Sequence, residues 1–409
     1  MRQAIESIVV VGASLAGLRT VEGLRAGGYT GSLTLIGSET HAPYDRPPLS
    51  KQVLLGRWDA AQNTLRDHAG LAELNVKTLL GRTAVGLRDE HDPGRRAVLL
   101  DDGSTVRYDR LVIATGASPR QLPGTDLEGV HTLRTIDDAL AIREAFAHSK
   151  RVVVVGAGFI GSEVASSARS YGLDVTVVEA LPAPLARVVG AEVGEECARL
   201  HRAHGVRLIC GEGVTALQAD TKISAVELTS GLHIPADLVV IGIGVTPTTG
   251  WLQGTSLTVD DGVVCNAYGM ADPTGSVYAV GDVSRWWHPL LGESLRVEHW
   301  THAAEQAHTV AHNLLAPPSD RRELTSVPYV WSDQYGVKIQ ITGRISPDND
   351  VTVRRSAGDP DRMIALYSRG GVLTGALAFN QPSQIARCRR LVAARASLQE
   401  AAELVGSPS

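Results

Sequence analysis

Two glycine-rich turns, Gly12–Gly17 and Gly156–Gly161, carry the clearest chemistry in this sequence of 409 residues. Each follows an apolar run and precedes a helix-like stretch, so the order strand, turn, helix occurs twice. In such a unit the glycines allow a tight turn and let backbone N–H groups approach a pyrophosphate at the helix start. One such turn is also compatible with plain helix–strand packing, whereas two predict two bound dinucleotides. An oxidoreductase is the simplest kind of protein that needs both.

The second turn has all three glycines and follows the apolar run Val152–Val155. A further apolar run, Val175–Val178, ends in Glu179, where an acid accepts hydrogen bonds from both ribose hydroxyls of an adenosine. Because its carboxylate repels a 2′-phosphate, Glu179 favours NADH over NADPH. The predicted NAD contacts are Gly156, Gly158, Phe159, Ile160, Gly161, Glu163, Glu179 and Gly244.

The first turn is less regular, since Ser14 replaces the second glycine. After it, the apolar run Leu33–Ile36 leads to Ser38 and Glu39, so the acid comes slightly late. Either of these two residues could hold a ribose. The departures affect the ribose contacts and leave the pyrophosphate turn in place.

Three more segments extend the pattern. Leu111–Gly116 and Val277–Asp282 are apolar runs that end in small residues, where a flat ligand can lie against the backbone. Pro43–Lys51 contains a stiff Pro-Pro pair just before its lysine. Each segment alone is also explained as an ordinary strand or turn, but the whole set in this order is hard to attribute to chance.

Together with Leu133–Thr135, Arg296–Trp300 and Pro328–Tyr335, these segments make the chain similar, nearly end to end, to a known family. It resembles the ferredoxin reductases of the glutathione-reductase-like superfamily, which include putidaredoxin, rubredoxin and dioxygenase ferredoxin reductases. Pro328–Tyr335 is the most family-specific segment, although Val330 stands where an aromatic residue usually precedes the tryptophan. The resemblance implies FAD at the first turn, NADH at the second, and a two-iron two-sulfur ferredoxin or similar small redox protein as the acceptor.

The resemblance also implies two catalytic residues. In the family, the lysine that matches Lys51 lies beside the flavin near its N5 edge, and the glutamate that matches Glu163 is its partner. A buried ammonium without a partner is costly, so we expect an ion pair. From its sequence context alone, Glu163 is better explained as a solvated helix charge.

Further FAD contacts follow from the same resemblance. Asp282 is expected to bond the ribityl chain or to cap the next helix, and Arg134 to neutralise the diphosphate or hold the adenosine end. His299 is not expected to donate a proton, because hydride transfer to a flavin needs no strong acid. The predicted FAD contacts are Gly12, Ala13, Ser14, Leu15, Ala16, Gly17, Ser38, Glu39, Arg46, Lys51, Val85, Ala114, Thr115, Gly116, Arg134, Gly281, Asp282, Glu298, His299 and Trp300.

The segment order predicts an α/β chain with two Rossmann-like dinucleotide-binding domains, for FAD and NAD, and a C-terminal α+β domain. We expect hinges at Ser118-Pro119 and Gly242–Pro247, and in the tail a strand over Val337–Ile341 and a helix over Ile385–Leu404. The predicted boundaries are 1–113 and 244–318 for the FAD domain, 114–243 for the NAD domain and 319–409 for the C-terminal interface domain.

The cysteines exclude one class of relative. None of them stands in a Cys-x-x-Cys or Cys-x-x-x-x-Cys pair, so the chain lacks a redox dithiol and its own iron–sulfur ligand set. We expect no metal site. The isolated cysteines are Cys197, Cys210, Cys265 and Cys388.

Charge bears on the partner. Between residues 319 and 409 basic residues outnumber acidic ones by 12 to 9, although the whole chain carries a net charge of −5. Arginines at 354, 355, 387, 389 and 390 either offer an acidic ferredoxin a positive patch or form a solvated face. No basic stretch carries interleaved aromatic residues, so we expect no nucleic-acid partner.

No apolar run approaches the roughly 18 residues of a membrane helix, and the first residues show no leader pattern. We therefore expect a cytoplasmic protein with no membrane partner, as a monomer or a weak dimer. The leading hypothesis is an NADH:ferredoxin oxidoreductase that serves a haem monooxygenase or a ring-hydroxylating oxygenase. The alternatives are an NADH oxidase or diaphorase that uses oxygen or a quinone, and a redox interaction protein of the apoptosis-inducing-factor type.

Overall fold

The structure, a computed structural model, describes residues 5–88, 92 and 94–406. The outer domain limits predicted at residues 1 and 409, and the first four residues of the expected leader-free start, lie outside this range. The described chain divides into two compact units. The first unit combines residues up to Asp45 with Asn63–Ser118 and Thr246–Ser326, and the second combines Arg46–Gln62 with Pro119–Val245 and the chain from Val327 onward.

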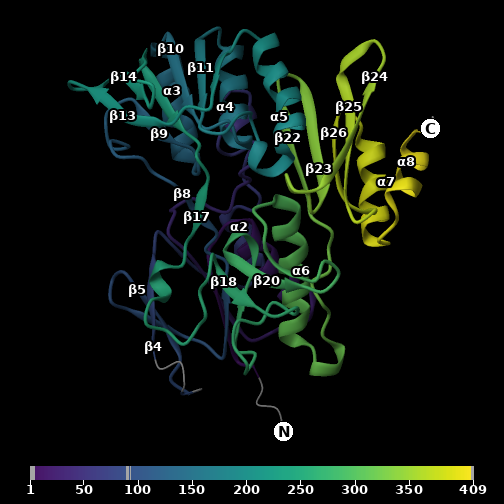
Figure 1. The fold of residues 1–409 in the computed structure, drawn as a ribbon. Coiled ribbons are helices and arrows are strands. Elements are labelled where there is room, and N and C mark those ends of the chain that lie inside the picture. The colour runs from purple at the N-terminus through teal and green to yellow at the C-terminus, as the bar shows by residue number, and fades with distance from the viewer. Residues whose placement is uncertain (1–4, 89–91, 93, 407–409) are drawn as a thin grey trace. The chain divides into compact units, whose positions relative to one another are not determined.

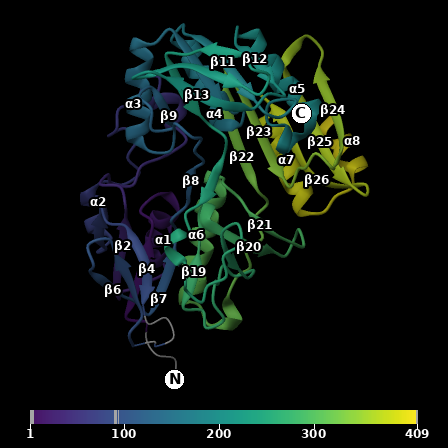
Figure 2. The same ribbon diagram turned by 60° about the vertical axis from the view of Figure 1, so that its left-hand side comes forward.

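The first unit is built on a parallel sheet with the order β19-β7-β1-β2-β3. Its strands are β1 (Ser7–Val11), β2 (Ser32–Gly37), β3 (Lys77–Leu80), β7 (Arg110–Ile113) and β19 (Val277–Ala279). The central strands are apolar on both faces because helices α1 (Leu15–Ala26) and α6 (Trp300–Leu315) pack over one face and further strands cover the other. Figure 2 shows α1 and α6 next to β2, β7 and β19.

Smaller elements complete the first unit. Two three-stranded sheets have the orders β4-β5-β6 and β18-β20-β21. The elements are α2 (His68–Glu73), β4 (Ala84–Arg88), β5 (Ala97–Leu100), β6 (Thr105–Arg107), η2 (Gly250–Leu252), β18 (Val263–Cys265), η3 (Gly281–Val283), β20 (Ser284–His288), β21 (Glu293–Arg296) and η4 (Pro318–Asp320).

The second unit repeats the parallel plan, with the sheet order β12-β11-β10-β16-β9. The sheet and its helices are β9 (Val130–Thr132), α3 (Ile136–His148), β10 (Arg151–Val155), α4 (Phe159–Ser170), β11 (Asp174–Glu179), α5 (Ala186–Ala203), β12 (Arg207–Cys210) and β16 (Leu238–Ile241). An antiparallel meander of β13 (Val214–Ala219), β14 (Ile223–Leu228) and β15 (His233–Pro235) packs on it. One π-helical turn, η1 (Leu49–Val53), joins this unit by packing against α3 and α4.

The C-terminal part of the second unit is an antiparallel sheet with two helices. The sheet order is β22-β23-β26-β25-β24, from β22 (Tyr329–Gln334), β23 (Val337–Gly343), β24 (Asp350–Ser356), β25 (Asp359–Arg369) and β26 (Val372–Phe379). Apolar residues of α5, including Val189, Val193 and Leu200, pack directly against this sheet. Figures 1 and 2 both show α5 running beside β22 and β23. This shared core explains why the tail belongs to the same compact unit as the parallel sheet β12-β11-β10-β16-β9.

The predicted fold class is confirmed, and so is the tail strand over Val337–Ile341. The single tail helix over Ile385–Leu404 is wrong, because the chain forms α7 (Pro382–Ala393) and α8 (Leu398–Gly406) instead. Arg395 between them takes a left-handed φ of 54°, which a continuous helix cannot contain. The helical pattern of the sequence continues without a break across the turn between α7 and α8, so it did not reveal that turn.

The chain passes between the units at five places, and two of them lie in β8 (Ala117–Pro119) and β17 (Val245–Pro247), the segments expected to be hinges. The division into two units reflects only which parts of the chain pack together. The division into an FAD domain, an NAD domain and an interface domain stays a prediction.

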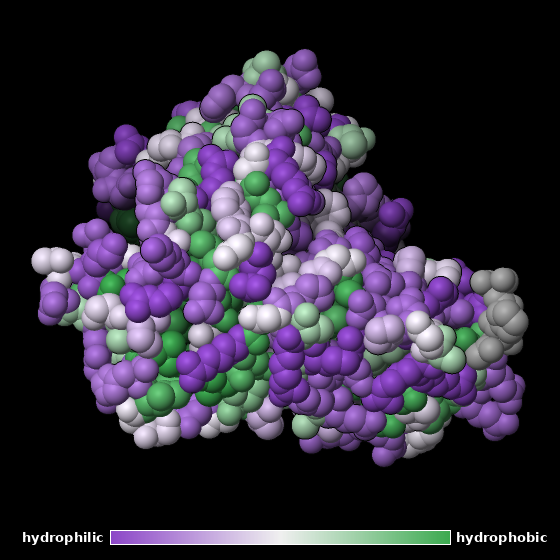
Figure 3. Space-filling model, turned by 90° about the horizontal axis from the view of Figure 1, so that it is seen from above, coloured by the Kyte–Doolittle hydropathy of each residue, from purple (hydrophilic) through white to green (hydrophobic). Residues whose placement is uncertain are grey.

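None of the helices within the described ranges combines the length and the hydropathy needed to span a bilayer. Figure 3 shows one face of the molecule, where hydrophilic side chains predominate and hydrophobic ones lie in smaller areas between them.

A buried histidine fastens the C-terminal sheet to the helices of the second unit. His201 on α5 is fully buried and shares hydrogen bonds with the Tyr335 hydroxyl (2.8 Å) and the Ser162 hydroxyl (3.2 Å). Burial, reinforced by the neighbouring His204 and Arg202, lowers the pKa of His201 to about 4. At pH values between about 4 and 6.5, the His201 ring is therefore neutral in the folded protein, whereas it is protonated in an unfolded chain.

We predict that the free energy of unfolding falls as the pH is lowered from 7 to 4. The unfolded chain binds a proton at His201 near pH 6.5 and the folded chain only near pH 4, so protonation favours unfolding by about 3 kcal/mol over this interval. Urea unfolding at several pH values measures the change. His201→Asn should have a shallower pH slope than the wild type, whereas His233→Asn, at an exposed position, should keep the wild-type slope. Parallel slopes for all three proteins would contradict the assignment.

Candidate functional site

The second glycine turn joins β10 to α4 and leaves space above its backbone. Gly156 has φ of 98°, and a Cβ there would meet the Gly242 carbonyl oxygen at 2.4 Å. A Cβ on Gly161 would lie 2.0 Å from the Gly156 oxygen, so both positions require glycine for packing. Gly158 differs, since the nearest atom to its Cβ would be 3.9 Å away. The protein itself does not need a glycine at 158, which fits a backbone kept bare for a bound pyrophosphate.

Glu179 is fixed at the end of β11, next to this turn. Its Oε2 accepts a hydrogen bond from the Ala157 N–H at 2.7 Å, and its Oε1 accepts one from the Leu181 N–H at 2.9 Å. Strand β11 pairs with β10 in parallel register, so both strands end at the same edge of the sheet. The carboxylate therefore lies where an adenosine ribose would meet the turn.

Other predicted NAD residues lie in the same unit as this turn. Ile160, the second residue of α4, is 44 % exposed, whereas Phe159 packs partly against the core formed by α5 and the C-terminal sheet. Gly244 has φ of 98°, and its carbonyl accepts a hydrogen bond from the Arg120 N–H at 2.9 Å. An exposed apolar side chain at the start of a helix suits contact with a ligand.

The first turn has the same construction in the other unit. Gly12 has φ of 116°, and a Cβ there would meet the Ala114 oxygen at 2.1 Å, while a Cβ on Gly17 would meet the Gly12 oxygen at 1.8 Å. Ser14 is the N-cap residue of α1 with extended backbone. Gly281 approaches the helix, since a Cβ there would lie 3.0 Å from that of Ala16. The first and third glycines are thus required by packing. Ser14 occupies the second glycine position, and the residue at that position in the other turn, Gly158, has room for a side chain.

Several predicted FAD residues of the first unit are held by protein partners. Glu39 accepts a hydrogen bond from the Tyr44 hydroxyl, whereas Ser38 is exposed. The Thr115 hydroxyl donates to the Thr248 carbonyl at 2.8 Å, and Gly116 has φ of 66°. Both candidate ribose residues stay predictions, as do the contacts from Leu15 and Ala13 in the turn and from the exposed Val85 on β4.

The start of α6 gathers another group of predicted residues. The indole N–H of Trp300 donates to Asp45 at 2.6 Å, and Glu298 accepts from Arg296 at 2.6 Å. His299 is the N-cap residue, and its buried Nδ1 has no hydrogen-bond partner among the described residues. Burial lowers the pKa of His299 to about 4, so the ring is neutral near pH 7. The expectation that His299 donates no proton in the reaction stays a prediction.

Asp282 lies inside the short turn η3, with Val280 at its N-cap position. The alternative that Asp282 caps the next helix is therefore wrong, while its contact with a ribityl chain stays a prediction. In the second unit, a guanidinium N–H of Arg46 donates to the Arg134 carbonyl, and the Arg134 N–H donates to Asp138 at 2.9 Å. Arg134 directly precedes Thr135 and the capping box that starts α3.

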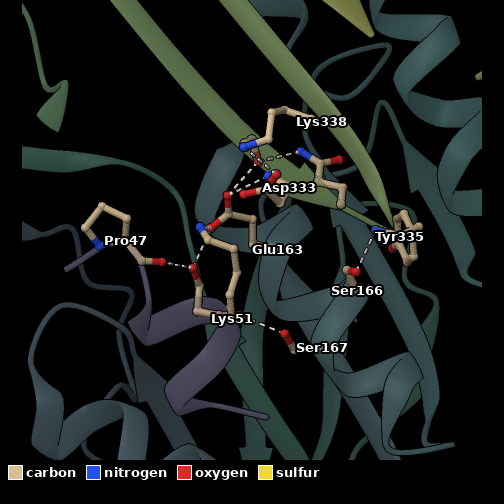
Figure 4. A network of polar contacts seen from close by, with 11 residues as sticks. Pro47, Lys51, Glu163, Ser166, Ser167, Asp333, Tyr335 and Lys338 are labelled. Atoms are coloured by element: carbon tan, nitrogen blue, oxygen red, sulfur yellow. Dashed lines mark hydrogen bonds and ion pairs between the residues drawn. The ribbon is translucent and has the colours of Figure 1, made fainter. Parts of the chain in front are cut away.

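The ion pair expected between Lys51 and Glu163 is present. Lys51 Nζ lies 2.7 Å from Glu163 Oε2, and the side chains are 13 % and 3 % exposed. Figure 4 shows the pair at the centre of a polar network that reaches from η1 through α4 to β22. The turn η1 is fastened to α4, because the Ser167 hydroxyl donates to the Ser50 carbonyl at 2.7 Å. A buried carboxylate and a largely buried lysine therefore form an ion pair inside the second unit of the fold.

Two further side-chain partners of Glu163 escaped the sequence analysis. The hydroxyls of Ser50 and Ser332 both donate to its carboxylate. Ser332 stands in the segment Pro328–Tyr335, which was singled out for its aromatic residues. Strand alternation could have found it, because β22 buries Ser332 and Gln334 at alternate positions.

The cysteines have no part in this chemistry. All four are free in the described chain. Burial raises the pKa of Cys197 and Cys265 to about 12 and that of Cys388 to about 11, so these thiols stay protonated near pH 7. Thiolate exchange is therefore not available to them.

Comparisons with known proteins cover the whole fold. Residues 6–307 match the family described as pyridine nucleotide-disulphide oxidoreductase, and residues 329–405 match the family described as reductase C-terminal. The chain is 36 % identical over 390 residues to rhodocoxin reductase of Rhodococcus erythropolis, covering 95 % of this chain and 89 % of that one. It is also 36 % identical over 396 residues to the ferredoxin–NAD(+) reductase component of the anthranilate 1,2-dioxygenase system of Burkholderia cepacia, covering 96 % and 95 %.

A solved structure agrees with these relatives. The reductase in the crystal structure of the covalent putidaredoxin reductase–putidaredoxin complex superposes with a TM-score of 0.90 at 33 % identity, covering 99 % of this chain and 96 % of that one. The resemblance deduced from the residues is thereby confirmed.

We predict that Gly158→Ala and Gly156→Ala separate ligand binding from folding. The added methyl at 158 has room in the protein but projects where a pyrophosphate would lie, so NADH affinity should fall at least about tenfold with little change in thermal stability. At 156 the methyl meets a backbone oxygen at 2.4 Å in a left-handed conformation, so that variant should lose stability as well. NADH titration and thermal unfolding of each variant provide the measurements. Unchanged NADH affinity in Gly158→Ala would be incompatible with a cofactor at this turn.

Proposed function

The chain belongs to the pyridine nucleotide-disulphide oxidoreductase family, and we propose that it is an FAD-dependent NADH:ferredoxin oxidoreductase. Its acceptor is a small iron–sulfur protein that serves a haem monooxygenase or a ring-hydroxylating oxygenase. Relatives named as reductases of rhodocoxin and of a dioxygenase ferredoxin system support this acceptor class. We place the activity in the cytoplasm, where NADH is regenerated.

The observation that carries the proposal is the pair of glycine turns, each at the end of a parallel strand and each with required glycines at its first and third positions. FAD, when bound, supplies the conversion of a two-electron hydride donor into single electrons for an iron–sulfur acceptor. The buried, protonated cysteines favour this route over disulfide chemistry, despite the name of the family.

The chain's own residues are proposed to bind and orient the two cofactors. The first turn with Asp282 is proposed to hold FAD, and the second turn with Glu179 to hold NADH. Lys51 is proposed to present its ammonium to the flavin, with Glu163 keeping that charge in place. His299 stays neutral, so backbone N–H groups near the start of α6 carry the polar contacts there.

The arginines proposed to attract an acidic ferredoxin differ in how they are held. Arg389 donates to the Val327 carbonyl at 3.0 Å and lies over the Tyr329 ring, and Arg387 donates to the Leu404 carbonyl. Arg355 forms an ion pair with Glu196 at 2.5 Å. Arg390 is exposed. Of this group, Arg390 is the best candidate for steering a partner, because replacing it disturbs the least packing.

We predict that NADH reduces the enzyme's flavin, and through it a two-iron two-sulfur ferredoxin, at least about tenfold more efficiently than NADPH. Repulsion of about 1.4 kcal/mol between the Glu179 carboxylate and a 2′-phosphate is enough for this ratio. Steady-state ferredoxin reduction with each nucleotide provides the measurement. Glu179→Gln removes the charge and keeps one oxygen, which can accept from one of the Ala157 and Leu181 N–H groups, so it should narrow the ratio.

The same assay distinguishes the alternatives. Oxygen consumption or quinone reduction in the absence of ferredoxin should be slow. An oxygen or quinone rate that matches or exceeds the ferredoxin rate would replace the proposal with an NADH oxidase or diaphorase. Absence of NADH-dependent turnover with every acceptor would favour a redox interaction protein.

We predict that ferredoxin reduction slows as salt is raised, while NADH-dependent reduction of a small uncharged dye does not. Screening shortens to about 10 Å at 0.1 M ionic strength, so steering between a basic patch and an acidic partner weakens. Arg390→Ser should lower the ferredoxin rate at low salt by up to about fivefold, the effect of ~1 kcal/mol for one exposed charge pair. Arg107→Ser, an exposed position in the first unit, is the matched control. A salt-independent rate that is unaffected by Arg390→Ser would mean that the ferredoxin docks elsewhere.

A further inference from the structure

The carboxylate of Glu163, on α4, receives four donors from two other segments. Oε2 accepts from Lys51 Nζ at 2.7 Å and from the Ser50 hydroxyl, both on η1. Oε1 accepts from the Ser332 hydroxyl at 2.7 Å and from the Asp333 N–H at 3.3 Å, both on β22. The side chain is only 3 % exposed, so water cannot replace a donor that is lost.

The direction of the Ser332 hydrogen bond is fixed by its neighbour. The side-chain amide N–H of Gln334 donates to the Ser332 oxygen at 3.1 Å. The hydroxyl proton of Ser332 is therefore available to the carboxylate, which can only accept while it is ionised. Ser332 and Gln334 are both fully buried, so the chain of contacts Gln334–Ser332–Glu163–Lys51 runs through the interior of the second unit.

The two oxygens of Glu163 are unequally protected against loss of a donor. If the Ser332 hydroxyl is removed, Oε1 keeps only the longer contact to the Asp333 N–H at 3.3 Å. A buried, under-satisfied oxygen is unfavourable, and the carboxylate must turn to regain a donor. Turning moves Oε2 away from Lys51, since both oxygens belong to one rigid group.

We propose that Ser332 is a positioning residue for the reaction, which acts on Lys51 through Glu163. The C-terminal sheet thereby sets the geometry of the charge pair, although none of its residues needs to touch the flavin. This inference rests on the proposed function only in treating Lys51 as the residue that serves the flavin.

The test compares Ser332→Ala with a control variant that loses a buried hydroxyl elsewhere in the same sheet. Thr342 on β23 is also fully buried, and its hydroxyl donates to the Pro328 carbonyl at 3.1 Å, without contact to Glu163. Thr342→Val removes one buried hydroxyl hydrogen bond, as Ser332→Ala does. The two variants therefore share a structural loss and differ in whether the ion pair is affected.

The first measurement is independent of turnover. Acetic anhydride acylates lysine amines in the purified FAD-loaded protein, and mass spectrometry quantifies the modification of Lys51 over time. An ammonium held in an ion pair is protected, so Ser332→Ala and Glu163→Gln should each label Lys51 about tenfold faster than the wild type. Thr342→Val should label it at the wild-type rate.

The double variant shows whether Ser332 acts through Glu163. In a Glu163→Gln background, Ser332→Ala should add no further increase in Lys51 labelling, because the group it positions is already altered. Stopped-flow reduction by NADH should show a lower limiting rate of flavin reduction in Ser332→Ala with an unchanged NADH dissociation constant. Ser332→Thr, which keeps the hydroxyl in a strand that favours β-branched residues, should restore both readouts.

Three results would overturn the inference. They are wild-type labelling of Lys51 in Ser332→Ala, equal labelling in Ser332→Ala and Thr342→Val, and additive effects of Ser332→Ala and Glu163→Gln. Failure of the proposed function has a different signature, since a protein that does not reduce ferredoxin can still show coupled labelling of Lys51.

Discussion

The ionised side chain of Glu163 is the group on which much of the second unit depends. A carboxylate that is 3 % exposed must be surrounded by donors, and no single element of this fold could supply four of them. The π-helical turn η1, the helix α4 and the strand β22 must therefore meet at one point. Removing one partner from a buried ion pair of this kind costs about 3–5 kcal/mol, so the meeting of these segments is strongly specified.

The two glycine turns impose a second constraint, which repeats in both units. In each turn the first and third glycines are required by backbone contacts shorter than 2.5 Å to an added Cβ, while the second position of the later turn, Gly158, has room for a side chain. The difference between Ser14 and Gly158 then has a physical meaning, because it falls at the position that the protein's own packing leaves open. Each parallel sheet presents its turn at the carboxyl ends of its strands, where open α/β sheets bind ligands.

The sequence was sufficient for the features that local patterns encode. Continuous apolar runs such as Val152–Val155 predicted buried parallel strands, and the glycine spacing predicted both turns. Lys51 and Glu163 lie far apart in the chain, and their pairing came from family resemblance, since no local pattern reports a contact over that separation. Ser332 was missed because a single buried serine in a strand looks like any small residue.

Two other features could not be predicted from the pattern of residues along the sequence. The break between α7 and α8 depends on one arginine in a left-handed conformation, which side-chain periodicity does not reveal. The association of Arg46–Gln62 with the second unit depends on tertiary contacts between η1 and α4, which exist only in the folded chain. Both follow from packing rather than from propensity.

The placement of Ser332 limits how freely this architecture can be recombined. A C-terminal sheet taken from another reductase would bring its own residue to the place of this serine, and a graft without a donor there would leave an oxygen of Glu163 poorly satisfied. Natural or engineered exchange of tails is therefore expected to succeed most readily between chains that share a small hydroxyl residue at this one buried position. The residue at position 332 in the tail and the helix that carries Glu163 should therefore change together during evolution.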